Sequence, residues 1–233
     1  TPVALLVGRR GERDDDGQLA IPGMERSAPR IRGRVGLGRM YGQALHLADE
    51  CYAKVLKPTT GKWAGMLSGH HYYPLLSGGT TDTYLAGKVK APFLGVDAVV
   101  RITFKDDSHH YGSIDIWCHH GSGNSKKPWG PLTKLADLAL SWDCDVFVIG
   151  HMTKKAKADI NRVYPVFASH GAWLNHKAVH LVGAGGWSKA FKVGDPQGTY
   201  VERGMMLPVV LGAPIIHVRP KWRMVDEGSR LHK

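Results

Sequence analysis

The chain has 233 residues, of which 43% are hydrophobic and 22% are charged, and this composition excludes wholesale disorder. Lysine and arginine number 31 against 20 acidic residues, so the net charge is +11, which attracts polyanions and phosphorylated ligands. The three cysteines are too few for a disulfide framework, and the longest nearly apolar stretch, 205–218, is too short to span a membrane. We therefore expect a cytoplasmic protein without a membrane partner. The sequence makes no prediction of its oligomeric state.

The first 40 residues differ in composition from the rest. Every basic residue in this segment is an arginine, glycine recurs without a hydrophobic period, and lysine dominates from Tyr41 onward. Two interpretations stay open, an arginine-glycine arm that tracks a nucleic-acid backbone or a segment translated in the wrong frame. We therefore divide the chain into an irregular segment (1–40), a folded domain (41–220) and a basic tail (221–233).

Hydrophobic periodicity and capping residues predict alternating helices and strands in the folded domain. The first half contains, in chain order, a helix over 41–56, a short strand over 63–67, a helix from Thr80 to before Pro92, and strands over 97–104 and 113–118. The second half contains a helix that begins at Pro131, a buried strand over 145–149, and short strands around 162–168, 178–182 and 209–218. This alternation predicts the α/β class.

Histidine is the most unusual feature of the composition, with 13 residues. Each of three predicted strands ends in or is followed by a segment in which histidine lies beside glycine: Gly69–His71, His119–Gly121 and Gly150–His151. One such histidine alone is more often a solvated loop residue. Strand ends in an open α/β sheet converge on one edge, however, and glycine permits close backbone approach. The three blocks together therefore predict a site for a transition metal, which imidazole binds well.

These blocks, in this order, resemble the calcineurin-like metallophosphoesterase superfamily. Residues 68–72 are similar to its GNH[DE] block, 117–123 to its isolated-histidine block and 145–155 to its GHxH block. Residues 79–83 and 198–212 resemble further segments of bacteriophage members. The resemblance covers roughly 41–220. It implies two packed mixed β-sheets flanked by helices, in a four-layer sandwich.

The resemblance also implies roles for individual residues. His119 and His151 would be ligands of one metal, and His71 would act as an acid or contact the scissile phosphate. His70 stands where the family has a metal-binding asparagine, and Thr153 stands where GHxH has its second histidine. We place His120, Ser122 and Lys154 as weaker candidates for contacts to the substrate phosphate.

Two upstream blocks of the family, DxH and GDxxD, are absent, and the nearest analogue of GDxxD is 7–12. An arginine there cannot replace the carboxylate that bridges two ions. We therefore expect at most one divalent transition metal (manganese, zinc or iron), held by His70, His119 and His151, where the family has two. The first strand would be missing too, and an uncovered sheet edge predicts a low soluble yield.

The resulting prediction is a metal-dependent phosphoesterase of impaired activity, acting on a phosphodiester or phosphomonoester. The alternatives are a non-catalytic, basic nucleic-acid-binding derivative of the same fold and a truncated remnant. Among the other candidates, the His109–His110 pair is predicted to lie in a hairpin connection, and His170, His176 and His180 to have packing or surface roles. Cys118 is predicted to be buried and inert.

Overall fold

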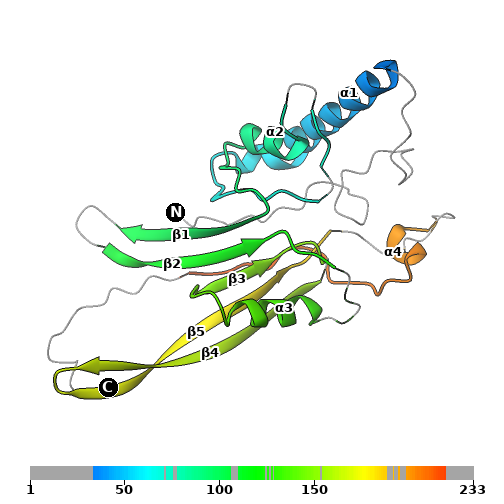
Figure 1. The fold of residues 1–233 in the computed structure, drawn as a ribbon. Coiled ribbons are helices and arrows are strands. Elements are labelled where there is room, and N and C mark those ends of the chain that lie inside the picture. Colours follow the sequence, from blue (N-terminus) through cyan, green and yellow to red (C-terminus); the bar gives the residue numbers. More distant parts are fainter. Residues whose placement is uncertain are drawn as a thin grey trace.

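The structure, a computed structural model, describes residues 34–70, 72–75, 78–105, 110–123, 125, 127, 129–152, 154–187, 191, 194 and 198–218. Its helices are α1 (Arg34–Cys51), α2 (Thr81–Lys88), α3 (Gly130–Leu138) and α4 (Tyr200–Arg203). Its strands are β1 (Asp97–Lys105), β2 (His110–His119), β3 (Val146–Ile149), β4 (Lys155–Ala168) and β5 (Gly171–Ala184). The strands form one mixed sheet in the order β1-β2-β3-β5-β4 (Figure 1).

The helices α1 and α2 form a helical unit beyond β1 (Figure 1). The predicted helix over 41–56 is confirmed, since α1 continues through a π-helical turn (Tyr52–Leu56) into a 3₁₀ turn (Lys57–Thr59) that contains Pro58. Helix α1 already begins at Arg34, inside the segment that we set apart as irregular, and residues 1–33 lie outside the described residues. A capping box between Thr80 and Thr83 begins α2, where the sequence predicted a helix start.

The sheet has a parallel centre and antiparallel flanks. Strands β2, β3 and β5 are parallel neighbours, whereas β1 pairs antiparallel with β2 and β4 pairs antiparallel with β5. All four residues of β3 are buried. The connection from β2 to β3 runs through α3, as parallel neighbours require a crossover.

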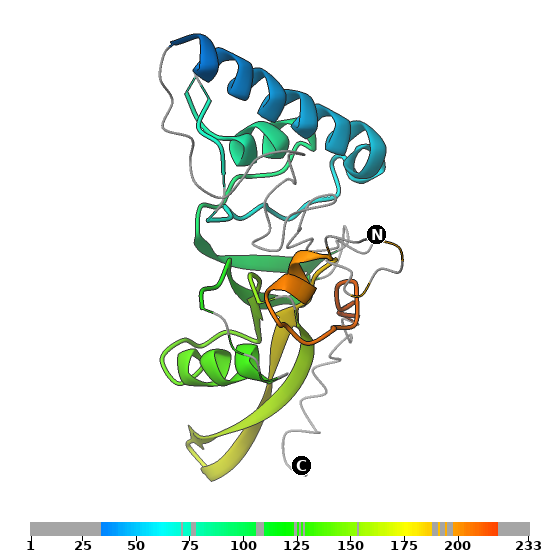
Figure 2. The same cartoon turned by 90° about the vertical axis from the view of Figure 1, so that its right-hand side faces the viewer.

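The two faces of the sheet have separate cores. On one face, α3 packs through Leu135 and Ala139 against Trp117, Phe147 and Leu181. On the other face, a second cluster consists of Ile116, Cys118, Val146, Val148 and Val182, with Leu67 packed against it. Figure 2 shows α3 on one side of the sheet and the chain from α4 onward on the other. We call these the α3 face and the opposite face.

The α/β class is confirmed, and so are the strands predicted over 97–104, 113–118 and 145–149. Strands β1 and β2 pair antiparallel, but His110 is the first residue of β2 and pairs with Lys105, so it does not lie in the hairpin connection as predicted. His109 lies outside the described residues. The described residues form one sheet, so the second sheet of the expected sandwich stays a prediction. In the same residues, no helix is both long and apolar enough to cross a membrane.

Two predicted strands are wrong. Within 63–67 only Met66 forms a bridge, to Phe93, because Trp63 and Met66 pack into the core of the helical unit. Within 209–218 only Gly212 forms a bridge, to Gly186. Proline has no N–H to donate to a ladder, and Pro208 and Pro214 limit pairing in this segment.

Candidate metal centre

The candidate site lies at the edge of the sheet where β2, β3 and β5 end. These strands are parallel and in register, since His119 pairs with Ile149 and Ile149 pairs with Gly183. Their carboxyl ends therefore meet at one edge, and the loops that follow them emerge side by side. This is the edge at which α/β sheets bind their ligands.

Three histidines come together at this edge: His70, His120 and His151. Each offers one ring nitrogen, and these atoms all lie within 4.8 Å of one another. Nδ1 of His70 and Nε2 of His120 are 2.7 Å apart, within hydrogen-bond distance. The ring of His151 lies edge-on to both, with centroids 4.4 Å from His70 and 5.4 Å from His120. His70 is exposed, and the other two are half-buried.

His151 is held in an unusual backbone conformation. Its φ is +58°, in the left-handed region that non-glycine residues rarely adopt. The N–H of Met152 donates to the carbonyl of Gly150 over 2.6 Å, which closes a tight turn around His151, and Gly150 N–H donates to His119 O over 3.1 Å. Backbone strain of this kind concentrates at functional sites, where the surrounding structure enforces it. The turn aims the imidazole of His151 back toward the other two.

Two glycines let the loops after β2 and β3 approach closely. A Cβ atom on Gly150 would lie 2.9 Å from the carbonyl oxygen of His120, and one on Gly121 would lie 2.8 Å from the carbonyl oxygen of Gly150. Real Cβ atoms do not approach backbone this closely. Gly121 also has φ +99°. The expectation that glycine beside histidine permits close approach is therefore confirmed at both positions.

The loop that carries His70 is fixed by α2 and by the segment before β1. Gly69 N–H donates to Oδ2 of Asp82 over 2.8 Å, and Ser68 N–H donates to Gly95 O over 2.7 Å. Asp82 lies in the first turn of α2 and is only 7% exposed. Sequence reasoning predicted only the start of the helix here and missed this contact. The hydrogen bond from Gly69 N–H to this buried carboxylate positions the backbone beside His70.

The structure places His120, and not the predicted His119, beside His70 and His151. Successive residues of a strand point to opposite faces, and β2 continues this alternation to its end. The ring of His119 stacks on Trp117, with centroids 5.7 Å apart, and its Nδ1 accepts a hydrogen bond of 2.6 Å from Gly121 N–H. His120 follows Cys118 onto the opposite face, where Leu67 leads the chain toward His70. His71, the predicted acid, lies outside the described residues, as does Thr153.

Cys118 and the later histidines have the structural roles expected of them. Cys118 is fully buried, and desolvation raises the pKa of its thiol to about 11. His180 Nδ1 lies 2.6 Å from Asp159 Oδ1, and His176 Nδ1 lies 2.9 Å from Asn161 Nδ2. These histidines are on β5 and outside the group of three.

The loop after His120 is held by two lysines. Lys134 of α3 donates from Nζ to the carbonyl of Ser122 over 2.6 Å, and Lys154 donates to the carbonyl of Ser125. Partial burial lowers the pKa of the Lys154 ammonium below its ordinary value. Ser122 and Lys154, both predicted as phosphate contacts, thus take part in fixing this loop. The two ammonium groups make the loop a positively charged element beside the histidines.

The donor set fits one transition-metal ion. Neutral imidazole nitrogens are good ligands for zinc, iron and manganese, and three protein ligands with one open position are typical of catalytic zinc sites. Two nitrogens bound to one tetrahedral zinc at about 2.1 Å lie roughly 3.4 Å apart, a separation between the 2.7 Å and the 4.8 Å that the three nitrogens span. Metal binding would therefore replace the His70–His120 hydrogen bond with only a small movement of the rings. Within the described residues, no other group of three histidine, cysteine or acidic side chains is this compact.

Comparisons of the chain with models of known families, with curated proteins and with solved structures gave no match. The resemblance to metallophosphoesterases therefore depends on the sequence blocks alone. The geometry of the three histidines stands independently of it.

Proposed function

We propose that this protein is a metal-dependent phosphoesterase whose single divalent ion is held by His70, His120 and His151. The observation that carries the proposal is the convergence of three imidazoles from three separate loops at one sheet edge. Side chains from distant parts of a chain meet only when the fold brings them together. Here the tight turn at His151 and the close contacts at Gly121 and Gly150 hold the loops beside each other.

The chain's own residues would bind and orient a phosphate ester at this edge. When bound, the ion supplies a Lewis acid that polarises a phosphoryl oxygen and lowers the pKa of a water toward about 7. Lys134 and Lys154 add positive charge beside the histidines and favour an anionic substrate. His71, next to His70 in the chain, is our candidate for the group that protonates the leaving oxygen.

We expect this protein to hydrolyse phosphate esters slowly. The group of three contains no carboxylate, so a second ion would lack the bridging ligand that a two-metal clamp requires. One ion cannot stabilise both the attacking and the leaving oxygens. We further propose that the chain shares the two-sheet architecture of metallophosphoesterases.

A basic, non-catalytic nucleic-acid-binding protein is the second candidate, and the net charge of +11 favours it. Several strand cations are already neutralised, however. Arg101 pairs with Asp115, and Arg162 and Lys177 both pair with Asp143. A polyanion would therefore have to compete with these carboxylates for the same cations.

Hydrolysis of a chromogenic phosphodiester, bis(p-nitrophenyl) phosphate, tests the proposal. We expect slow turnover with added manganese or zinc, none with a chelator, and none in His120→Asn. His119→Asn is the matched control, because the amide oxygen of asparagine can still accept the hydrogen bond from Gly121 N–H. Turnover that survives His120→Asn, or that needs no metal, would overturn the proposal. Salt-sensitive binding of oligonucleotides without turnover would support the second candidate instead.

A further inference from the structure

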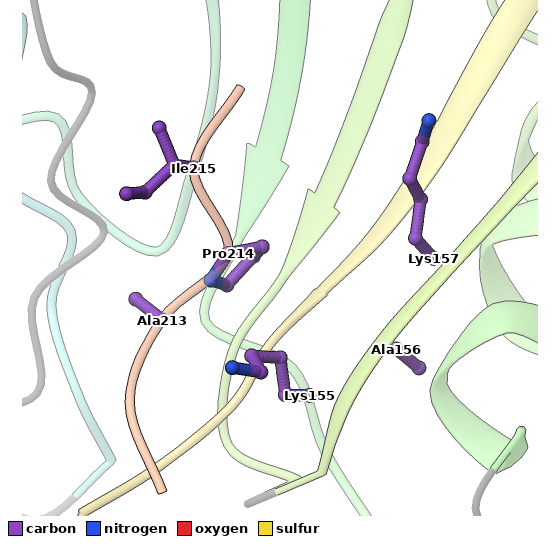
Figure 3. A pocket seen from close by; sticks show the side chains of 6 residues that line it. All are labelled: Lys155, Ala156, Lys157, Ala213, Pro214 and Ile215. Atoms are coloured by element: carbon purple, nitrogen blue, oxygen red, sulfur yellow. The ribbon is translucent and has the colours of Figure 1, made fainter. Parts of the chain in front are cut away.

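A pocket of about 480 Å³ lies beside the first residues of β4. Lys155, Ala156 and Lys157 of β4 line one side, and Ala213, Pro214 and Ile215 line the other. Figure 3 shows the two lysines on β4 and the three apolar residues on the C-terminal segment that runs past it. The volume is in the range of small-molecule sites, and the lining combines apolar surface with a few charged groups, as such sites do.

The C-terminal wall of the pocket is held in place by contacts among three glycines. Gly212 N–H donates to Gly186 O over 2.8 Å, which attaches residues 213–215 to the end of β5. A Cβ atom on Gly185 would lie 2.2 Å from the carbonyl oxygen of Gly212, so only glycine permits this approach. Ile215, which follows, is 81% exposed. Residues 213–215 therefore form an apolar surface beside Lys155 and Lys157.

The pocket lies on the same edge and the same face of the sheet as the three histidines. Lys155 pairs with Ala184, one residue beyond the level at which Ile149 pairs with Gly183. Side-chain alternation along β4 places Ile160 on the α3 face, so Lys155 and Lys157 point to the opposite face, as His120 does. Because β4 is two strands from β3 in the sheet, about 10 Å separates Lys155 from the turn at His151.

The two lysines supply a cationic site that is only partly neutralised. Lys157 Nζ lies 3.5 Å from Asp159 Oδ2, but that carboxylate also contacts His180 at 2.6 Å. Within the described part of the chain, Lys155 has no carboxylate at ion-pair distance. The pocket therefore carries net positive charge beside an apolar wall. An anionic group linked to a planar or apolar group complements both features.

We propose that this pocket binds the portion of a phosphodiester that lies beyond the scissile phosphate, and that the substrate is a nucleotide with a second phosphate. Lys155 and Lys157 would pair with that second phosphate, while Pro214 and Ile215 pack against the sugar and base. One phosphate group cannot bridge about 10 Å, so an organic unit has to connect the two charges. The inference rests on the proposed function at the histidines.

The test compares two chromogenic substrates and one binding probe. The first substrate is thymidine that carries a 5′-(p-nitrophenyl phosphate) and a 3′-phosphate, and the second is bis(p-nitrophenyl) phosphate, which has no nucleotide. We expect the wild type to favour the first in kcat/KM, and Lys155→Gln/Lys157→Gln to lose at least 10-fold on the first and less than 2-fold on the second. Lys57→Gln/Lys62→Gln, which removes the same charge from the helical unit, should change neither.

Equilibrium binding separates failure of this inference from failure of the proposed function. The probe is fluorescently labelled thymidine 3′,5′-bisphosphate, measured by anisotropy with and without zinc. Weaker binding in Lys155→Gln/Lys157→Gln, but not in Lys57→Gln/Lys62→Gln, supports the pocket even if no substrate is hydrolysed. Equal affinity in all three proteins, or an unchanged substrate preference in an active enzyme, would overturn it.

Discussion

The two ends of the sheet differ in how tightly they are built. At the carboxyl edge of β2 and β3, the loops approach so closely that no Cβ fits at Gly121 or Gly150. At the other end, β4 and β5 reach beyond β3, which pairs with β5 only from His180 to Gly183 (Figure 1). Residues 161–178, which we call the arm, carry large exposed apolar side chains, including Phe167 at 78% and Leu174 at 66% exposed.

This difference shows that strand pairing alone does not give a strand a packed core. Both ends contain β-branched and aromatic residues in regular strand pairing. Only the end with a core on both faces has buried strands, because α3 covers one face and a second apolar cluster fills the other. The loops that carry His120 and His151 continue directly from β2 and β3, so these buried strands fix where both loops begin. The arm has no such support.

The largest contrast should appear in stability, between two leucines of β5. Leu181 is 2% exposed and packs in the α3 core, whereas Leu174 in the arm is 66% exposed. We expect Leu181→Ala to lower the free energy of unfolding by about 2–5 kcal/mol, because it leaves a cavity. Leu174→Ala should change it by no more than about 0.5 kcal/mol. Urea denaturation of both variants checks this, and similar losses would show that the arm is packed in solution.

The next effect concerns the close contact between the loops that follow β2 and β3. Gly150→Ala would place a Cβ 2.9 Å from the carbonyl oxygen of His120, so the two loops would have to separate. We expect zinc affinity to fall by roughly 10–100-fold, the usual effect of disturbing the support of a ligand. Isothermal titration measures it. Gly87→Ala in α2, where no atom lies within 4 Å of the added Cβ, is the matched control and should leave zinc affinity unchanged.

A smaller effect is expected from the carboxylate that positions His70. Asp82→Ala removes the acceptor for Gly69 N–H and leaves that loop less constrained. We expect zinc affinity to fall by about 10-fold, with a loss of roughly 1–2 kcal/mol in stability. The control is Asp137→Ala on the exposed side of α3. Unchanged zinc affinity in Asp82→Ala would show that His70 is positioned by other contacts.

The smallest effect involves an ion pair across β1 and β2. Arg101 donates two hydrogen bonds to Asp115, of 2.6 and 2.7 Å, and this guanidinium holds the pKa of the carboxyl below its ordinary value. A lowered folded-state pKa stabilises the protein above the unfolded value of about 3.9. That contribution is lost as the pH falls through the folded-state pKa. Because Arg101 is exposed, we expect Asp115→Asn to lower Tm at pH 7 by only about 1–3 °C.

Thermal denaturation from pH 7 down to pH 2 measures this dependence. The Tm difference between wild type and Asp115→Asn should shrink at the acid end, and Arg101→Gln should behave in the same way. A difference that persists at pH 2 would assign the effect to packing rather than charge.

Much of the fold could be predicted because local signals decide it. The capping residues at Thr80 begin α2, and the continuous apolar run of β3 indicates a strand buried on both faces. The segment 63–67 could not be predicted in this way, because a short apolar run is also compatible with packing into a helical core, which is what Trp63 does. Contacts with residues distant in sequence, and not the local pattern, determine that this segment is not a strand.

The position of the candidate site was predictable, but which histidines come together there was not. Glycine beside histidine after β2 and β3 indicated this edge of the sheet, whereas His70 lies in a loop that follows no strand. The choice between His119 and His120 depends on which face of the sheet the site occupies, and that face is set by His70, which is 50 residues away in sequence from His120. A one-residue shift along a strand reverses the side-chain direction, so local pattern cannot decide between neighbours. The contact of Asp82 with Gly69 is likewise long-range and has no local signal.

Zinc binding by the wild type, His119→Asn and His120→Asn, measured by competition with a chromogenic chelator, tests the central claim most directly. The account predicts one zinc per chain in the wild type and in His119→Asn, and a loss of at least 100-fold in affinity in His120→Asn. Equal loss in both variants, or loss in His119→Asn alone, would contradict it.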